Sequence, residues 1–314
     1  MARYVAKRLL WMIPITLGVA VLVFTLMTFC PGDPAEIILG STATEENLES
    51  LRQELGLNQP FFVRLGTFLS DTFLHFDLGN SWATGASVKD AILERLPRTL
   101  ILATTMMAIS FCIGVPLGIM AAIHQNQWQD NLCMTLALIG ISIPNFWLAL
   151  LLVLLFSVKL GWLPAMGIGG LQYYILPGCT GGIATSARQT RSSMLDVIRS
   201  DYITTARAKG VPEHQVIIKH ALKNGMIPII TVMGTHFGKM LGGTMIIETI
   251  FSIPGMGQLI INAVNGRDYQ VVQVGAVFLA IAFSFCMLAV DLLYAAVDPR
   301  IKAKYSSKGR KKVK

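Results

Sequence analysis

Few side chains in this sequence have the types and spacing that chemistry requires. His236 and Lys239 are three residues apart within an apolar segment, so a helix would place both on one face. Ionisable groups at membrane depth usually face a bundle interior or an aqueous path. We therefore predict that the two residues line a passage; the alternative is that neighbouring groups neutralise the pair, or that the Lys239 ammonium extends to the membrane surface. For Glu248 and Asp291, nearer the ends of apolar segments, structural pairing is favoured over contact with a solute.

No group of residues has the pattern of a catalytic site. The sequence has five histidines but no HExxH motif, no Gly-rich phosphate-binding loop followed by Lys, and no cluster of carboxylates within the apolar segments. A membrane-embedded enzyme that uses Lys239, His236 and Asp291 is an alternative, but it lacks the nucleophile, base and orienting group that such chemistry needs. We therefore predict no catalytic residue and no enzymatic activity in this chain.

The five cysteines have no spacing that suits a metal site. Each lies within or at the edge of an apolar segment, which is typical of a small apolar core residue. We predict neither a disulfide nor a bound metal for them. They are Cys30, Cys112, Cys133, Cys179 and Cys286.

The composition is that of a membrane protein, since 53% of the 314 residues are hydrophobic and only 14% are charged. The net charge of +8 would suit nucleic acid, but the charges fall at the ends of apolar segments, which argues against such a partner. Apolar runs of about 20 residues have the length that a bilayer-spanning helix requires. We predict an all-α integral membrane protein with six transmembrane helices, the fourth being short and rich in Gly and Thr. The predicted spans are 9–30, 99–123, 132–157, 173–187, 226–250 and 271–297.

The distribution of Lys and Arg predicts the orientation, because cytoplasmic loops hold an excess of these residues. Segments 1–8, 124–131, 188–225 and 298–314 together carry eighteen of the 26 Lys and Arg, whereas the segments on the other side carry seven. Both termini and the loop 188–225 are therefore predicted to be cytoplasmic. The first apolar run is too long for a signal-peptide core and lacks a cleavage site, so we interpret it as a retained span.

The same segments predict the domain organisation. Residues 1–30 form the cytoplasmic N-terminal end and first span, and residues 31–98 an extracytoplasmic segment with ten of the 18 acidic residues and a helix over 45–55 that ends at Gly56. Residues 99–297 form a five-helix core that includes the cytoplasmic loop 188–225. The tail 298–314, with eight Lys or Arg, is interpreted as a basic anchor at the lipid bilayer rather than a specific partner site.

The polar stretch 200–228 predicts an ordered turn between apolar segments. Asp201 suits the cap of a short helix over 202–209, and Gly210 supplies the positive φ that ends helices. Pro212 suits the first position of a second short helix, with Glu213 in its first turn. An ordered, cationic helix–turn–helix on the cytoplasmic side indicates a docking surface for another protein.

Two further patterns predict local structure. The pairs Gly114/Gly118 and Gly238/Gly242 have the small-xxx-small spacing that allows close helix packing. Residues 252–268 predict a Pro-Gly turn followed by a short amphipathic helix. No internal repeat is found that would support an inverted-repeat secondary transporter.

At DYITTARAKG and HALKNGMIP the sequence resembles the permease subunit of ATP-binding-cassette (ABC) importers of the dipeptide, oligopeptide and nickel class. The resemblance covers nearly the whole chain and implies the type I ABC importer permease fold. It also rests on blocks that occur in the family's order: RYVAKRLL, IPITLGV, PGDP, ELGLNQP, DLGNSW, LERLPRTL, GISIPNFWLALLLVLLFSV, LGWLPAMG, RSSMLDV, ETIFSIPGMGQL, RDYQVVQ and DLLYAAVDPRI.

In that family the cytoplasmic loop is a coupling segment that docks on an ATPase subunit. The Glu of the general importer motif is absent here, because Thr204, Thr205 and Ala206 occupy the positions six, five and four before Gly210. The resemblance therefore leaves no Glu salt bridge at this point. The coupling positions that it implies are Asp201, Tyr202, Ala206, Arg207, Ala208, Lys209 and Gly210.

The resemblance also implies a set of partners in a bacterial inner membrane. These are a second, homologous permease subunit, two cytoplasmic ATP-binding subunits and an extracytoplasmic substrate-binding protein. ATP and Mg are expected on the ATP-binding subunits, and no cofactor on this chain. A passive channel is a further alternative, for which the ordered cytoplasmic turn would have no evident use.

The cargo that the resemblance implies is a di- or oligopeptide, with a nickel complex as the alternative. His236, LPAMG and GGTMIIE also resemble members that transport nickel complexes, and His is a reasonable Ni(II) ligand. However, a single membrane histidine without a second ligand at helical spacing is a poor metal site. We therefore predict peptides.

Overall fold

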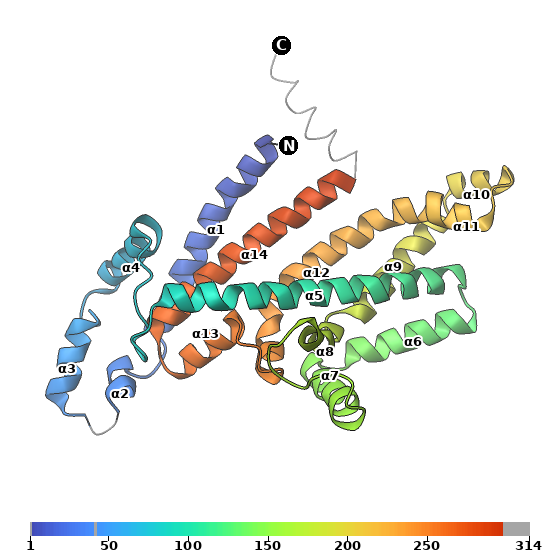
Figure 1. Ribbon diagram of the computed structural model, residues 1–314. Coiled ribbons are helices and arrows are strands. Elements are labelled where there is room, and N and C mark those ends of the chain that lie inside the picture. The colour runs from blue at the N-terminus through green and yellow to red at the C-terminus, as the bar shows by residue number, and fades with distance from the viewer. Residues whose placement is uncertain (1, 41–42, 298–314) are drawn as a thin grey trace, which may run out of the picture. The chain divides into compact units, whose positions relative to one another are not determined.

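The computed structural model of the protein describes residues 2–40 and 43–297, with side chains described for 5–40, 43–238 and 240–292. All regular elements in this part of the chain are helices, joined by turns and loops, and its only β pairing is a single bridge between Asn80 and Ser87 (Figure 1). The predicted basic tail, 298–314, lies outside the described residues. The chain divides into two compact units. Two long helices, α5 and α14, each begin in one unit and end in the other.

One unit comprises residues 2–99 and 254–285. Its helices include α3, which ends just before Gly56 with φ +66 as predicted, and α13, the predicted amphipathic helix after a Pro-Gly turn. Residues 31–98 therefore pack with the first helix and with 254–285. The elements are α1 (Ala2–Thr28), α2 (Pro34–Leu39), α3 (Glu45–Glu54), α4 (Phe61–Ser70), the π-helix η1 (Asp71–His75), α13 (Met256–Asn265) and the N-terminal parts of α5 (Val88–Ile123) and α14 (Tyr269–Val297).

The other unit comprises residues 100–253 and the described residues from 286 onward. One apolar cluster in it includes Leu102, Leu176 and Phe251, and a second surrounds Met194 and Ile217. The elements are α6 (Trp128–Ser142), α7 (Asn145–Leu152), the π-helix η2 (Val153–Lys159), the 3-10 helix η3 (Leu171–Tyr174), α8 (Ile175–Cys179), α9 (Ile183–Ile198), α10 (Asp201–Ala208), α11 (Glu213–Gln215), the π-helix η4 (Val216–Leu222) and α12 (Lys223–Ile250).

Four described helices are long and apolar enough to cross a membrane, in agreement with the first, second, fifth and sixth predicted spans. The third predicted span is a bent pair of helices. Its first half is α6, its second half is α7 with the adjoining η2, and the bend between the halves is 108°. Ile143, which precedes Pro144, has the extended conformation (φ −78°, ψ 127°) that a following proline favours, so the helix ends there. The bent pair counts as a fifth span only if both halves cross together. Six transmembrane helices therefore stay a prediction.

The fourth predicted span, 173–187, is not one helix. The short helix α8 ends at Cys179, and α9 starts only at Ile183. Gly182 lies between them with φ +76, a left-handed conformation that breaks a right-handed helix. Hydropathy alone did not reveal the break, because Gly and Thr are nearly neutral on such scales. The helix that follows extends into the polar loop as far as Ile198.

Close packing is confirmed at the first glycine pair. A Cβ on Gly114 would lie 2.6 Å from the Ser186 Cβ, and a Cβ on Gly118 would lie 2.5 Å from the Thr190 Cβ and overlap the Ala187 carbonyl oxygen. Helices α5 and α9 thus approach each other at backbone distance. At Gly242 a Cβ would meet no atom of the described chain within 4 Å, so the second pair makes no such contact there.

Candidate functional site

The predicted helix–turn–helix is present at the end of α9. Helix α10 runs over Asp201–Ala208, and Ser200 rather than Asp201 is its N-cap, with extended dihedral angles (φ −76°, ψ 150°). The Ser200 hydroxyl donates to the Val197 carbonyl at 2.6 Å, so no side chain caps α10. Asp201 lies instead in the first turn, where the helix dipole favours an acid. The prediction of Asp201 as the cap was therefore wrong by one residue.

One face of α10 is buried. Ile203 is fully buried and Ala206 is 8% exposed, and both belong to an apolar cluster with Met194 and Ile217. The spacing of three residues is what places two side chains on one helix face. The sequence analysis did not single out Ile203. The available signal was an apolar residue three positions before Ala206, a spacing that places both on one helix face. Ala206 was predicted as a coupling position; it is buried in this chain, and its role in coupling stays a prediction.

The other predicted coupling positions are each exposed to solvent, and their role in coupling stays a prediction. They are Asp201, Tyr202, Arg207, Ala208, Lys209 and Gly210.

Gly210 adopts the left-handed conformation that the sequence predicted, with φ +75. Its amide donates to the Arg207 carbonyl at 2.9 Å, and the Val211 amide donates to the Ala206 carbonyl at 3.3 Å, which closes the helix end. A Cβ at Gly210 would meet no atom of the described chain within 4 Å. The constraint on this residue is therefore conformational and not steric.

Two polar contacts join α10 to the helix that follows. The Arg207 guanidinium bonds the Glu213 carboxylate at 2.6 and 3.1 Å, and the Asn224 amide donates to the Tyr202 hydroxyl at 2.8 Å. Hydrogen bonding to the Glu213 carboxylate raises the pKa of Arg207 above its ordinary value. Because both side chains of the ion pair are largely exposed, the pair adds little to the free energy of unfolding. Its main effect is to hold α10 and α11 in position.

The second helix of the turn is not short. Helix α11 starts at Glu213, and Pro212 is its N-cap rather than its first residue, one position from the prediction. The helix continues without a break through the π-helical η4 into α12. The backbone is thus helical from Glu213 to Ile250. Extended helices transmit displacement along their axis, whereas a flexible loop would absorb it. The turn is therefore joined directly to the helix that contains His236.

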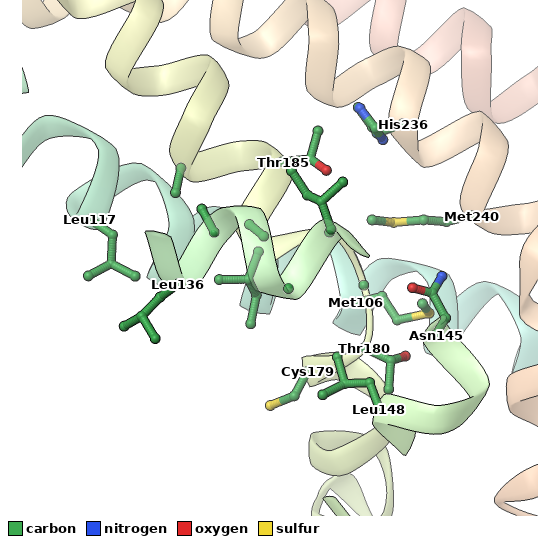
Figure 2. Close-up of a pocket in the computed structure, with 18 of the residues that line it drawn as sticks. Met106, Leu117, Leu136, Asn145, Leu148, Cys179, Thr180, Thr185, His236 and Met240 are labelled. Atoms are coloured by element: carbon green, nitrogen blue, oxygen red, sulfur yellow. The ribbon is translucent and has the colours of Figure 1, made fainter. Parts of the chain in front are cut away.

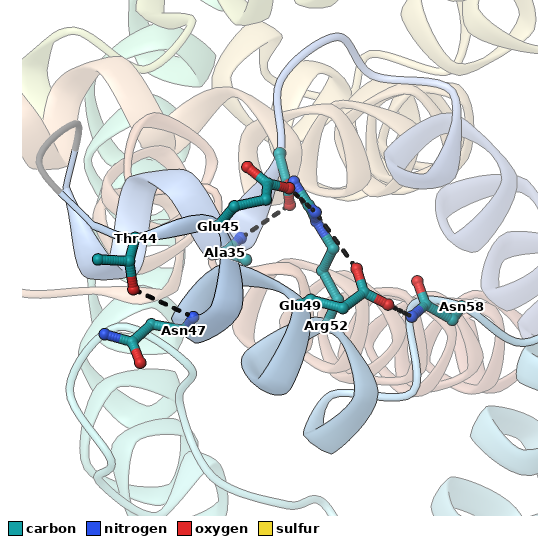
Figure 3. A network of polar contacts seen from close by, with 8 residues as sticks. Ala35, Thr44, Glu45, Asn47, Glu49, Arg52 and Asn58 are labelled. Atoms are coloured by element: carbon teal, nitrogen blue, oxygen red, sulfur yellow. Dashed lines mark hydrogen bonds and ion pairs between the residues drawn. The ribbon is translucent and has the colours of Figure 1, made fainter.

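His236 lines a cavity of about 470 Å³ in the same unit (Figure 2). Asn145 at the start of α7, Thr180 after α8 and Thr185 in α9 add polar groups to a wall that is otherwise mainly apolar. A mostly apolar cavity with a few polar groups is typical of a site for a small organic molecule. The Lys239 side chain lies outside the described residues, so its predicted place beside His236 in the lining of a passage stays a prediction.

The residues that the structure describes contain no group of three or more His, Cys, Asp and Glu side chains that could hold a metal ion. His236 therefore has no set of neighbouring ligands there with which to bind Ni(II). Glu248, an acidic residue near the end of the same helix, is fully buried.

The chain matches two families of transport proteins. Residues 114–303 match the family described as "Binding-protein-dependent transport system inner membrane component", and residues 1–103 match a family of the N-terminal region of such membrane components. Curated relatives include the glutathione transport system permease protein GsiC of Salmonella paratyphi A, which is 45% identical over 97% of this chain and 100% of its own length. The protein of the same name from Escherichia coli K12 is 44% identical over the same shares.

Among solved structures, a chain of the MetNI methionine ABC transporter in an inward-facing conformation has the same fold. The TM-score is 0.57 at 21% sequence identity, and the match covers 66% of this chain and 96% of that chain. A second crystal form of the same transporter matches with a TM-score of 0.55 at 20% identity. This likeness supports the type I importer permease fold that the sequence predicted.

Proposed function

This chain belongs to the family of inner membrane components of binding-protein-dependent transport systems, and from that premise we propose that its cytoplasmic turn couples a partner ATPase to a passage for peptides. As a member, it is a permease subunit of a dipeptide- and oligopeptide-type ABC importer, a transport component rather than an enzyme. Its place is the bacterial inner membrane, where importer permeases work with an ATPase and a substrate-binding protein.

The cargo that we propose is a short peptide of the size and chemistry of glutathione. The relatives that carry the name glutathione transport system permease match this chain along its length at 44–45% identity, which supports a peptide. The nickel alternative lacks support from the relatives and from the surroundings of His236. His236 and, at the next turn of α12, Lys239 would line the passage beside the cavity of Figure 2.

In the proposed assembly this chain supplies half of the passage and a second, homologous permease subunit supplies the other half. Two ATP-binding subunits, which carry ATP and Mg, dock on the cytoplasmic side, and a binding protein delivers cargo from outside. The orientation has both termini and the loop 188–225 in the cytoplasm, with six spans in all. The excess of Lys and Arg in these segments supports it.

The observation that carries the coupling proposal is the construction of the turn. One face of α10 is anchored through Ile203 and Ala206, its other face is exposed, and the chain continues as helix into the membrane segment. A partner that pushes on the exposed face would therefore displace α12. Gly210 sets the angle between α10 and that helix through its left-handed backbone.

The experiment compares Gly210→Val with Gly210→Asn in the reconstituted complex. A β-branched residue is strained in the left-handed region, whereas Asn tolerates it. We expect Gly210→Val to insert normally but to lose most cargo-stimulated ATP hydrolysis, and Gly210→Asn to retain it. Normal stimulation in Gly210→Val would refute the role of this glycine.

The cargo is tested by binding of radiolabelled glutathione, an unrelated dipeptide and a nickel–histidine complex to the partner binding protein. We expect binding of a peptide and none of the nickel complex. The opposite pattern would contradict the cargo proposal without affecting the coupling proposal, because the latter is measured with whichever cargo binds.

A further inference from the structure

A second cavity, of about 290 Å³, lies in the unit formed by residues 2–99 and 254–285. It is smaller than the sites that take drug-sized ligands, and its wall is mostly polar in residue type. Five structural elements contribute to it: α1, the end of α3, α4 with η1, the segment near Trp82, and the start of α14. No feature of the coupling turn or of the His236 cavity belongs to it.

The wall of this cavity carries opposite charges that do not neutralise one another. Arg64 lines it together with the acids Glu54 and Asp71. Within the described residues no ion pair joins Arg64 to an acid; its guanidinium lies 5.8 Å from the centre of the Phe24 ring instead. Burial lowers the pKa of Arg64, but a guanidinium stays protonated at any physiological pH. A half-buried cation without a carboxylate partner calls for an anion.

One buried polar group of the same wall also lacks a protein partner. Thr72 is 4% exposed, and its hydroxyl oxygen has no hydrogen-bond partner in the described part of the chain. Gln273, also 4% exposed, and Gln270 add two carboxamides, of which Gln270 donates to the Leu78 carbonyl at 2.9 Å. A buried polar group without a partner costs free energy unless a ligand or water satisfies it.

We propose that this cavity binds a small zwitterion, a free amino acid or a dipeptide, with its carboxylate on Arg64 and its ammonium group on Asp71 and Glu54. A guanidinium matches the two oxygens of a carboxylate, and a pair of acids matches an ammonium. The volume limits the ligand to one or two residues. Such a site would bind a molecule of the same class as the proposed cargo, yet it lies apart from the coupling turn and does not depend on it.

The test uses the full-length permease in nanodiscs of phosphatidylglycerol, whose headgroup has no ammonium group, without a binding protein. The probe is radiolabelled alanyl-alanine, with N-acetylated and C-amidated forms as competitors. We expect saturable binding that both blocked forms compete for poorly. Arg64→Gln should weaken binding by about tenfold or more and remove the discrimination against the amide. Glu54→Gln with Asp71→Asn should remove the discrimination against the acetylated form.

The matched control is Lys89→Gln, which removes an exposed cation of the same unit away from the cavity. It should leave binding unchanged. Arg64→Lys keeps the charge and reports whether loss in Arg64→Gln comes from misfolding, because it should retain part of the binding. Absence of saturable binding in the wild-type permease would overturn the proposal.

Two other outcomes would show that the cavity binds something other than a free amino acid or dipeptide. Each of them would overturn the proposal. If Arg64→Gln weakened only the association with the binding protein, Arg64 would receive an acidic side chain of that partner. If only phosphatidylethanolamine bound, the cavity would hold a lipid headgroup. Failure of the coupling proposal would leave dipeptide binding in this assay intact, so the two proposals are tested separately.

Discussion

At the scale of single residues, the turn at the end of α10 depends on side chains with different tasks. Gly210 contributes a left-handed backbone conformation, and there is open space where its Cβ would be. Ile203 is buried, whereas Tyr202 and Lys209 are exposed. The sequence predicted the backbone conformation of Gly210, because this glycine follows a predicted helix. It did not predict which neighbours are buried, because burial depends on the helices that pack against α10.

Ile203→Ala tests the anchoring of α10. Truncating a fully buried aliphatic side chain costs about 2–4 kcal/mol, so we expect α10 to loosen and cargo-stimulated ATP hydrolysis to fall several-fold while insertion is unchanged. The control is Thr204→Ala, the next residue, whose side chain is exposed. Equal activity in the two variants would mean that the position of α10 does not depend on Ile203.

Arg207→Ala has a smaller expected effect. The ion pair with Glu213 is 40% and 56% exposed at its two side chains, so its loss should lower stability by no more than about 1 kcal/mol. Binding of the ATP-binding subunit should fall by more than stability does, because Arg207 is one of the exposed positions proposed to contact that subunit. Unchanged ATPase binding would limit Arg207 to supporting the turn.

At the scale of elements, composition predicted helices correctly but not where they break. The bend at Pro144 lies inside a continuous apolar stretch, and hydropathy averages over such a point. Likewise the turn at Gly182 interrupts a predicted span, and the π-helical η4 extends a helix that Gly and Pro signals had suggested to be short. Each difference is a backbone event that local residue types allow and tertiary packing decides.

The contact of α5 with α9 gives a test at this scale. Gly118→Ala would press a methyl group on the Ala187 carbonyl and the Thr190 side chain, an overpacking that costs about 1–3 kcal/mol. We expect a lower Tm in detergent, measured by fluorescence-detected size exclusion after heating. Gly242→Ala is the control, since its Cβ meets nothing in the described chain, and the isolated subunit should keep its Tm.

A buried ion pair joins α6 to α9 and gives a second test. The Arg191 guanidinium bonds both oxygens of Asp130, at 2.5 and 2.7 Å, and Asp130 is only 2% exposed. Asp130→Asn would leave a partly buried cation without its partner, at a cost of about 3 kcal/mol. The Tm should fall by several degrees. Glu94→Gln, which breaks the exposed pair with Arg98, should have almost no effect.

At the scale of the whole molecule, the fold that this chain shares with its family includes a polar turn whose geometry supports the proposed coupling role. The membrane class, the all-α fold and the family could be predicted from composition and residue blocks. The cavities could not, because their lining residues come from segments far apart in the sequence, such as Arg64 and Gln273. Long-range juxtaposition of this kind has no signal in a single sequence.

Cross-linking from single cysteines in a cysteine-free variant tests the central claim, that the exposed face of α10 docks on an ATP-binding subunit. With a short bifunctional reagent, we predict that Tyr202→Cys and Lys209→Cys each give a cross-linked species with that subunit. Ile203→Cys, on the buried face between them, should give none. Cross-links from Ile203→Cys alone, or none from either exposed position in an ATPase-competent complex, would contradict the account.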